Sequence, residues 1–153
     1  MENDRHLLSD IRLGLRHKRL RPVYAVDTVF RRVPSDAGLL TDIGLISGRD
    51  NLAQAIILRL LTPRGELAAL GHPDYGSRLH ELVGEQNTET TRNLARLFIL
   101  ESLRLESRIE EVIEVIVEPD QGSRDRINVL LRVKPIGVAS LVTIGPFQLE
   151  LEQ

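Results

Sequence analysis

Three carboxylates in the middle of the chain, Glu66, Asp74 and Glu106, are the side chains whose type and spacing could support catalysis. Glycoside hydrolysis needs only two carboxyl groups, one kept protonated in an apolar pocket and one ionised. The chain has 22 acidic residues, so coincidental groupings are expected, and aromatic residues, which usually line a sugar site, make up only 3% of it. A cell-wall-cleaving enzyme is therefore the alternative, and a protein that is not an enzyme is the first hypothesis.

The chain lacks the residue patterns that metal binding, phosphate binding or cysteine chemistry would need. The histidines are His6, His17, His72 and His80, and no pair of them has the spacing of a metal site. No glycine-rich loop is followed by Lys and Ser or Thr, as phosphate binding would require. The chain also has no cysteine. We therefore expect no cofactor and no metal.

Positive charge is concentrated near the N-terminus. The segment from Asp4 to Arg32 has eight Lys or Arg residues and three acidic ones, although the whole chain has a net charge of −2. This segment could meet an acidic surface or simply be solvated. A nucleic-acid-binding module is a third hypothesis, but few aromatic side chains are available for base stacking, so we expect no nucleic acid among the partners. We expect no membrane span either, because no stretch approaches roughly 20 apolar residues.

The chain divides into a basic N-terminal extension, residues 1–37, and one domain, residues 38–153. Apolar residues are sparse in the extension, and its two proline steps interrupt any helix, because the residue before proline avoids the α region. A short amphipathic helix remains compatible with the spacing of Leu7, Leu8, Ile11 and Leu15.

Helical periodicity predicts two main helices in the domain. Residues 40–48 are typical of one short strand or two, and Leu52, Ile56 and Leu60 then recur at helical spacing until Thr62-Pro63 ends the first helix. A long helix is predicted from Thr88 to Leu105. It has two apolar stripes, so we expect it to be covered on two sides. The members of the stripes are Leu94, Leu97, Phe98, Glu101 and Leu105 in one and Ala95, Ile99 and Leu103 in the other.

The segment between these helices is rich in turn residues. It is predicted to form a turn, a brief extended run over residues 67–70, and a second turn. A short helix follows, with Ser77 as its cap and Gly84 in the left-handed position that ends it.

Alternation of apolar and polar residues predicts three strands at the C-terminal end, over residues 112–118, 127–134 and 141–152. Turn-rich connections between them favour an antiparallel meander. The predicted fold class is α+β, with helices packed on a C-terminal three-stranded antiparallel sheet and a short strand or hairpin before the first helix.

The turn-rich segment reads Leu58-Arg59-Leu60-Leu61-Thr62-Pro63-Arg64-Gly65-Glu66, and further on Pro73-Asp74-Tyr75-Gly76-Ser77. It resembles the baseplate wedge family of contractile phage tails, which includes gpW of P2-like phages and the wedge subunit of type VI secretion baseplates. The family pattern is a helix ending in Leu-x-Thr-x-x-Gly-Glu, then Pro-x-Tyr/Phe-Gly-Ser and a short Leu-rich helix. Residues 38–152 can be aligned with the family in order, and residues 42–54 match its usual lead-in.

This turn motif has a structural interpretation. Glycines permit positive φ, proline fixes its own φ, and threonine can cap a helix, so the motif would form a rigid connector between two helices. The connector could pack only its own domain or contact a partner directly, and the sequence leaves both open. The residues of the motif are Thr62, Gly65, Glu66, Pro73, Tyr75 and Gly76.

A Glu-Pro-Arg triplet at the end of the long helix is a second mark of the family. Here it reads Glu106-Ser107-Arg108, with the proline replaced. The resemblance implies that Glu106 and Arg108 contact partners. We also expect the last strand, with Leu149 and Leu151, to offer an edge to another chain.

The resemblance implies a structural role in a baseplate. The chain would join other wedge subunits, help to initiate the tail sheath, and contact the central hub or tube. It would be assembled in the bacterial cytoplasm, in several copies around the tail axis. Several family members carry a lysozyme label, but the residues of this chain do not support its transfer. The sequence leaves open whether the machine is a phage tail, a tailocin, a secretion system or an extracellular injection system.

Overall fold

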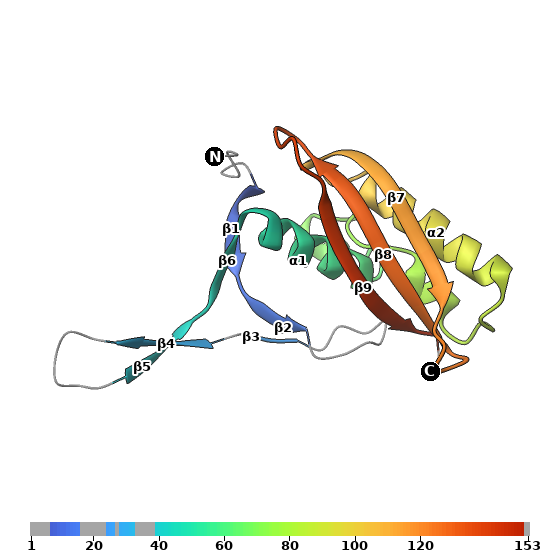
Figure 1. Cartoon of the computed structure of the whole chain (residues 1–153), viewed down its shortest axis with the longest axis horizontal. Helices are drawn as coiled ribbons and strands as arrows, with labels where there is room; N and C mark the ends of the chain where they lie inside the picture. The colour runs from blue at the N-terminus through green and yellow to red at the C-terminus, as the bar shows by residue number, and fades with distance from the viewer. Residues whose placement is uncertain (1–6, 16–23, 27, 33–38, 152–153) are drawn as a thin grey trace.

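A computed structural model describes residues 7–15, 24–26, 28–32 and 39–151. Two helices pack on a C-terminal three-stranded antiparallel sheet, and short strand pairs precede the first helix (Figure 1). The predicted α+β class is confirmed. In the described part of the chain, no helix is both long and apolar enough to cross a membrane.

The sheet is a meander of β7 (Ile109–Pro119), β8 (Arg126–Pro135) and β9 (Val142–Glu150), with β8 in the centre. Alternation decides which face is buried, because successive side chains of a strand point to opposite faces. On β8, Ile127, Val129, Leu131 and Val133 are fully buried, whereas Arg132 between them is exposed. The three predicted strands and their antiparallel order are confirmed.

Helix α1 (Gly48–Leu61) contacts β9, and helix α2 (Glu89–Leu103) packs along β7. The Thr88 hydroxyl oxygen accepts a hydrogen bond from the Thr91 N–H at 3.2 Å, which satisfies one free donor at the start of α2. Helix α2 has the predicted limits within about two residues, and α1 ends directly before Thr62-Pro63, as predicted.

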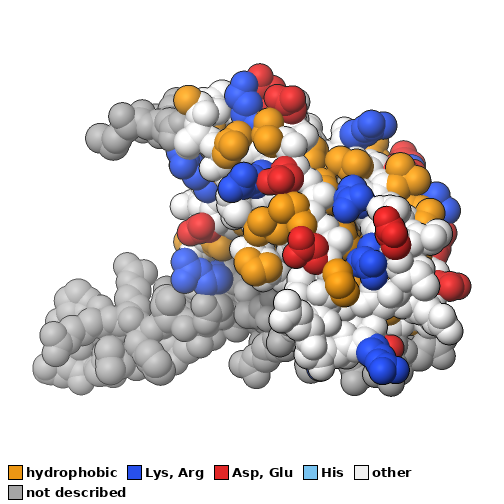
Figure 2. All heavy atoms as spheres, turned by 45° about the vertical axis from the view of Figure 1, so that its right-hand side comes forward, with side chains coloured by type: hydrophobic (Ala, Val, Ile, Leu, Met, Phe, Trp, Pro, Cys, Tyr) orange, Lys and Arg blue, Asp and Glu red, His pale blue; other side chains and the backbone are white. Residues whose placement is uncertain are grey.

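The expectation that α2 is covered on two sides is wrong. Ala95, Ile99 and Leu103 are buried, but in the other stripe only Phe98 is buried, and its three leucines are 40% to 56% exposed. The sheet offers α2 a single face, so one apolar stripe remains at the surface. Figure 2 shows hydrophobic side chains lying between charged ones on this side of the molecule.

The N-terminal residues form strands, so the amphipathic helix that the sequence allowed is wrong. Their bounds are β1 (Ser9–Ile11), β2 (Leu13–Leu15), β3 (Tyr24–Val26), β4 (Thr28–Arg32), β5 (Leu39–Ile43) and β6 (Leu45–Ser47). The pair β1–β6, here called the stem, leads directly into α1. The pairs β2–β3 and β4–β5, here called the arm, are two separate two-stranded sheets. Figure 1 shows β4–β5 extending away from the helices and the three-stranded sheet.

Helix α1 holds the root of this N-terminal part through side-chain amides. The Asn51 side chain donates to the Leu7 carbonyl at 3.0 Å. The Gln54 side chain donates to the Ile11 carbonyl and accepts from the Leu13 N–H, both at 2.9 Å. Leu7 itself is fully buried in the core. Residues at the start of the predicted extension therefore pack on the domain.

The connection between α1 and α2 contains two short 3-10 helices, η2 (Ala68–Leu70) and η3 (Leu79–Leu82). The extended run predicted for residues 67–70 is therefore wrong, since η2 occupies it. The short helix predicted after Ser77 is present as η3, and the Ser77 hydroxyl accepts from the Leu79 N–H at 3.2 Å.

Candidate functional site

Four side chains from three parts of the chain meet at the corner where α2 gives way to β7. Arg59 comes from α1, Tyr75 from the turn motif, and Glu106 and Arg108 from the segment after α2. The Glu106 carboxylate accepts from Arg108 Nε at 2.7 Å and from Arg59 Nη2 at 3.3 Å. The Arg59 guanidinium lies over the Tyr75 ring, 4.5 Å from its centroid. We call these four residues the charged corner.

The electrostatics of the charged corner keep Glu106 ionised. Burial by itself would raise the pKa of this carboxyl, because it disfavours the charged form. The hydrogen bond from Arg108 and the charges of Arg108 and Arg59 outweigh burial, so the pKa of Glu106 lies below its ordinary value. The residue is only 6% exposed. The corner is thus a buried carboxylate held between two arginines.

The turn motif fixes the side of the corner that carries Tyr75. The Thr62 hydroxyl donates to the Leu58 carbonyl at 2.7 Å, and the Ser77 N–H donates to the Thr62 carbonyl at 2.8 Å, so the two ends of the motif are joined. Gly76 lies between these ends with a φ of +107°, and a Cβ there would be 2.5 Å from the Thr62 oxygen. Only glycine fits this position, because both the backbone conformation and the space exclude a side chain.

The motif is also joined to α2. The Ser102 hydroxyl donates to the Gly76 carbonyl at 2.9 Å, and Arg64 forms an ion pair with Glu101. These bonds connect the turn motif to both helices. Whether it also contacts a partner stays a prediction.

The predicted site residues outside the last strand separate into three groups. Tyr75, Glu106 and Arg108 meet at the charged corner. Glu66 and Pro73, two members of the turn motif, have exposed side chains. The remaining motif residues, Thr62, Gly65 and Gly76, shape the connector.

The predicted partner residues of the last strand do not present their side chains to solvent. Leu149 and Leu151 are 1% and 2% exposed and belong to the hydrophobic core. Their role in partner binding stays a prediction. For Leu149 only the backbone of β9, which is an edge strand, could carry it. Leu151 follows the end of β9, and its backbone N–H and carbonyl bond to Asp125 and Gly84.

Arg59 is the member of the charged corner to which the sequence assigned no role. It lies in the buried stripe of α1 with Leu52, Ile56 and Leu60, and it is only 9% exposed. A charged residue at a buried helical position needs a partner of opposite charge. The position of Arg59 among apolar residues of the helix was therefore the signal in the sequence that could have identified it. Its partner Glu106 is 47 residues away along the chain, so local patterns do not reveal the pair.

The three carboxylates considered for catalysis have different environments. Glu66 and Asp74 are exposed, and Asp74 lies 3.6 Å from Arg64. Glu106 is buried, but its pKa is lowered, whereas a general acid needs a raised one. Among the described residues there is no group of three or more His, Asp or Glu that could hold a metal ion.

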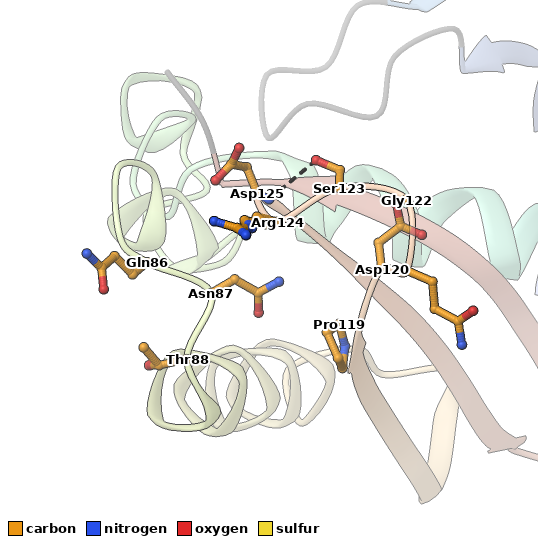
Figure 3. Close-up of a pocket in the computed structure, with 10 residues that line it drawn as sticks. Gln86, Asn87, Thr88, Pro119, Asp120, Gly122, Ser123, Arg124 and Asp125 are labelled. Carbon is orange, nitrogen blue, oxygen red and sulfur yellow. Dashed lines mark hydrogen bonds between the residues drawn. The ribbon is translucent and has the colours of Figure 1, made fainter.

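An open groove with a volume of about 660 Å³ lies between the N-terminal end of α2 and the β7–β8 loop (Figure 3). Gln86, Asn87 and Thr88 line one side and residues 119–125 line the other. Asp120 in this loop accepts hydrogen bonds from Asn128 at 3.2 Å and Gln148 at 3.3 Å. These bonds tie the loop to the sheet, and the groove contains none of the predicted site residues.

Comparison with known proteins gives a similarity to a solved structure. No protein-family model matches the chain, and no curated protein matches it. Among solved structures, the chain is similar to a Geobacter sulfurreducens protein named "putative tail lysozyme", with 27% sequence identity and a TM-score of 0.55. The match covers 71% of this chain and 97% of the Geobacter chain.

Proposed function

We propose that this chain is a non-catalytic structural subunit of the baseplate of a contractile tail or a related injection machine. The observation that carries the proposal is the similarity to the Geobacter protein named for a tail, which extends over nearly that whole chain. In the proposed role the subunit joins neighbouring wedge proteins and gives the tail sheath its first docking surface.

The charged corner supports a partner contact at Arg108. Its side chain is 19% exposed, and its Nε binds Glu106, which fixes its orientation. In the described part of the chain its two terminal nitrogens make no hydrogen bond, and they could therefore receive a partner carboxylate. Breaking a desolvated charged contact at an interface costs about 2 to 5 kcal/mol of binding.

Complementation of a strain in which the gene for this chain is deleted tests this role. We expect Arg108→Ala to give baseplates that lack sheath in electron micrographs, and Arg124→Ala, which removes an exposed arginine elsewhere, to give normal tails. Melting curves of both isolated variants accompany the micrographs, because Arg108→Ala also loses a hydrogen bond to Glu106 worth about 1.5 to 3 kcal/mol. Normal sheathed tails from Arg108→Ala would contradict the contact.

A lysozyme-like enzyme is the second candidate, favoured by the name of the Geobacter protein. The environments of these carboxylates argue against it, because Glu66 and Asp74 are exposed and the pKa of the buried Glu106 is lowered. Digestion of purified peptidoglycan by the intact protein is the direct test. Measurable cleavage that disappears in Glu66→Gln/Asp74→Asn would replace the structural proposal with the enzymatic one.

A further inference from the structure

The open side of helix α2 has three exposed leucines in a row. Leu94, Leu97 and Leu105 are 40%, 56% and 46% exposed, and their spacing of three and eight residues places them on one side of the helix. We call these three residues the leucine face. Figure 1 shows α2 on the side of the molecule away from β4–β5, so these strands do not cover the face.

The two ends of the leucine face have opposite charges. Glu89 is the first residue of α2, and Arg104 directly follows its last residue. Both side chains are exposed, and neither forms an ion pair with any other residue that the structure describes. Glu101 lies between the leucines, but Arg64 pairs with it and neutralises its charge. The free charge is therefore negative at the start of α2 and positive at its end.

This order of charges is complementary to a second copy of itself that runs in the opposite direction. In two antiparallel helices related by a twofold axis, residues at the same level have numbers with a constant sum. A sum of 193 brings Glu89 of one copy level with Arg104 of the other, at both ends of the pair. The twofold axis then passes between residues 96 and 97, so the two Leu97 side chains lie together at the centre.

A second groove, beside α2, fits the same register. It has a volume of about 490 Å³, and Leu82, Leu94 and Phe98 supply its apolar lining. Thr88 also lines it, and at a sum of 193 Thr88 of one copy is level with Leu105 of the other. Leu105 is on the same side of α2 as Leu94 and Phe98, and a twofold axis brings equal sides of antiparallel helices together. The exposed Leu105 side chain therefore has an apolar groove to enter.

We propose that two copies of this chain pair through the leucine face of α2, antiparallel about a twofold axis beside Leu97. The contact covers the exposed leucines and forms an ion pair between Glu89 and Arg104 at each end. A pair of single helices buries less than the roughly 1,200 Å² at which standard stable interfaces begin, so the dimer is in equilibrium with the monomer. The pairing is a property of the isolated protein, so its test does not depend on the baseplate role.

Sedimentation velocity of the purified full chain measures the pairing, and the dimer fraction of the wild type should rise with concentration. Glu89→Arg and Arg104→Glu each place like charges at both ends of the pair. Each should lower the association constant at least about tenfold. The double variant Glu89→Arg/Arg104→Glu restores opposite charges without changing the net charge, so it should associate within about threefold of the wild type.

The double variant also separates the contact from the helix dipole. The dipole favours an acidic residue at the start of α2 and a basic one at its end, even in a monomer. A role in the dipole alone makes the double variant the least stable of the three in thermal melting and gives it no recovery of association. A double variant that associates as weakly as the single ones overturns the proposal.

The register can be tested by cross-linking, because the chain has no cysteine of its own. Leu97→Cys lies beside the twofold axis and should form a disulfide between two copies under mild oxidation. Thr90→Cys is exposed on the same side of α2, but its two copies lie about 20 Å apart in the antiparallel pair and should not cross-link. Leu45→Cys, exposed in the stem, is the control for random collision and should stay monomeric.

Two results would contradict the pairing. Cross-linking of Thr90→Cys as efficient as that of Leu97→Cys would mean a parallel or unspecific contact. A wild type that stays monomeric at about 1 mM would mean that the leucine face does not bind its own copy. Either result overturns the proposal.

Discussion

Glu106 is the only acidic residue that is buried among the described ones, and it shows how a single group joins distant segments. Arg59 approaches it from α1, and Arg108 from the start of the sheet. Because the carboxylate is ionised in the folded protein and its pKa is lowered, the charged form stabilises the fold. The stabilisation is present above the ordinary pKa of a glutamate, about 4.3, and is lost as pH falls through the lower pKa of the folded state.

We therefore predict that Glu106→Gln lowers the free energy of unfolding by about 1.5 to 3 kcal/mol at neutral pH, because the amide keeps the shape but not the charge that the two arginines face. The difference from wild type should shrink below about pH 4, where the wild-type carboxyl is also neutral. Urea unfolding across this pH range measures it. A difference that stays constant down to the acid limit would show that charge is not the cause.

Gly76 and Gly71 offer a matched pair at positive φ. Both have a left-handed backbone conformation. A Cβ on Gly71 would have no atom within 4 Å, whereas a Cβ on Gly76 would lie 2.5 to 2.9 Å from backbone atoms. We predict that Gly71→Ala costs about 1 to 2 kcal/mol, the strain of the left-handed conformation alone. Gly76→Ala should cost clearly more, because the turn motif must also open. Thermal melting of the two variants compares them, and equal costs would contradict the close approach at Gly76.

Helix α1 is the element that connects the other parts of the fold. Leu52, Ile56 and Leu60 fill the core, while Asn51 and Gln54 bind the backbone of the N-terminal strands. Arg59, near its C-terminal end, reaches the charged corner. The helix thus couples the arm to the corner through a rigid segment.

We predict that Gln54→Ala releases the root of the arm without unfolding the domain. The Leu13 N–H loses its acceptor and the Ile11 carbonyl its donor, so amide hydrogen exchange should accelerate in peptides that cover residues 9–13. Gln86→Ala, at an exposed glutamine outside this contact, is the control and should leave exchange there unchanged. Unchanged exchange in Gln54→Ala would mean that strand pairing alone holds the root.

The elements differ in how well the sequence predicts them. The three strands of the meander were predictable because apolar and polar residues alternate along each strand, which is a local signal. On β8, for example, Leu131 is buried and its neighbour Arg132 is exposed. The N-terminal strands were not, because β1 pairs with β6 across more than 30 residues and its burial pattern is exposed throughout. Likewise, the two stripes of α2 were correctly identified, but only the tertiary arrangement decides that one of them stays at the surface.

At the scale of the whole molecule, the core includes residues near both ends of the chain. Leu7 and Leu151 are both buried in the same hydrophobic cluster as the helices and the sheet. The Gly84 N–H donates to the Leu151 carbonyl at 2.6 Å, which ties the end of the described chain to the segment after η3. Loss of either leucine should therefore affect the entire domain.

Leu7 and its neighbour Leu8 test this directly. We predict that Leu7→Ala destabilises the domain by about 2 to 5 kcal/mol, because a fully buried side chain leaves a cavity. Leu8→Ala removes the same atoms from a side chain that is 61% exposed and should change stability by no more than about 0.5 kcal/mol. Urea unfolding of both variants measures the contrast. Similar small effects would mean that the N-terminal segment is dispensable for the core.

The stem has a consequence for how this architecture can vary. Ile11 and Leu45 are direct partners in the β1–β6 ladder, so the chain leaves the domain and returns to it at nearly the same place. Everything between them is an insertion into a hairpin, and the entropy of closing such an insertion grows only slowly with its length, by about 0.6 kcal/mol for each doubling. Changes in the length or sequence of the arm during evolution should therefore have little effect on the stability of the domain formed by the helices and the three-stranded sheet.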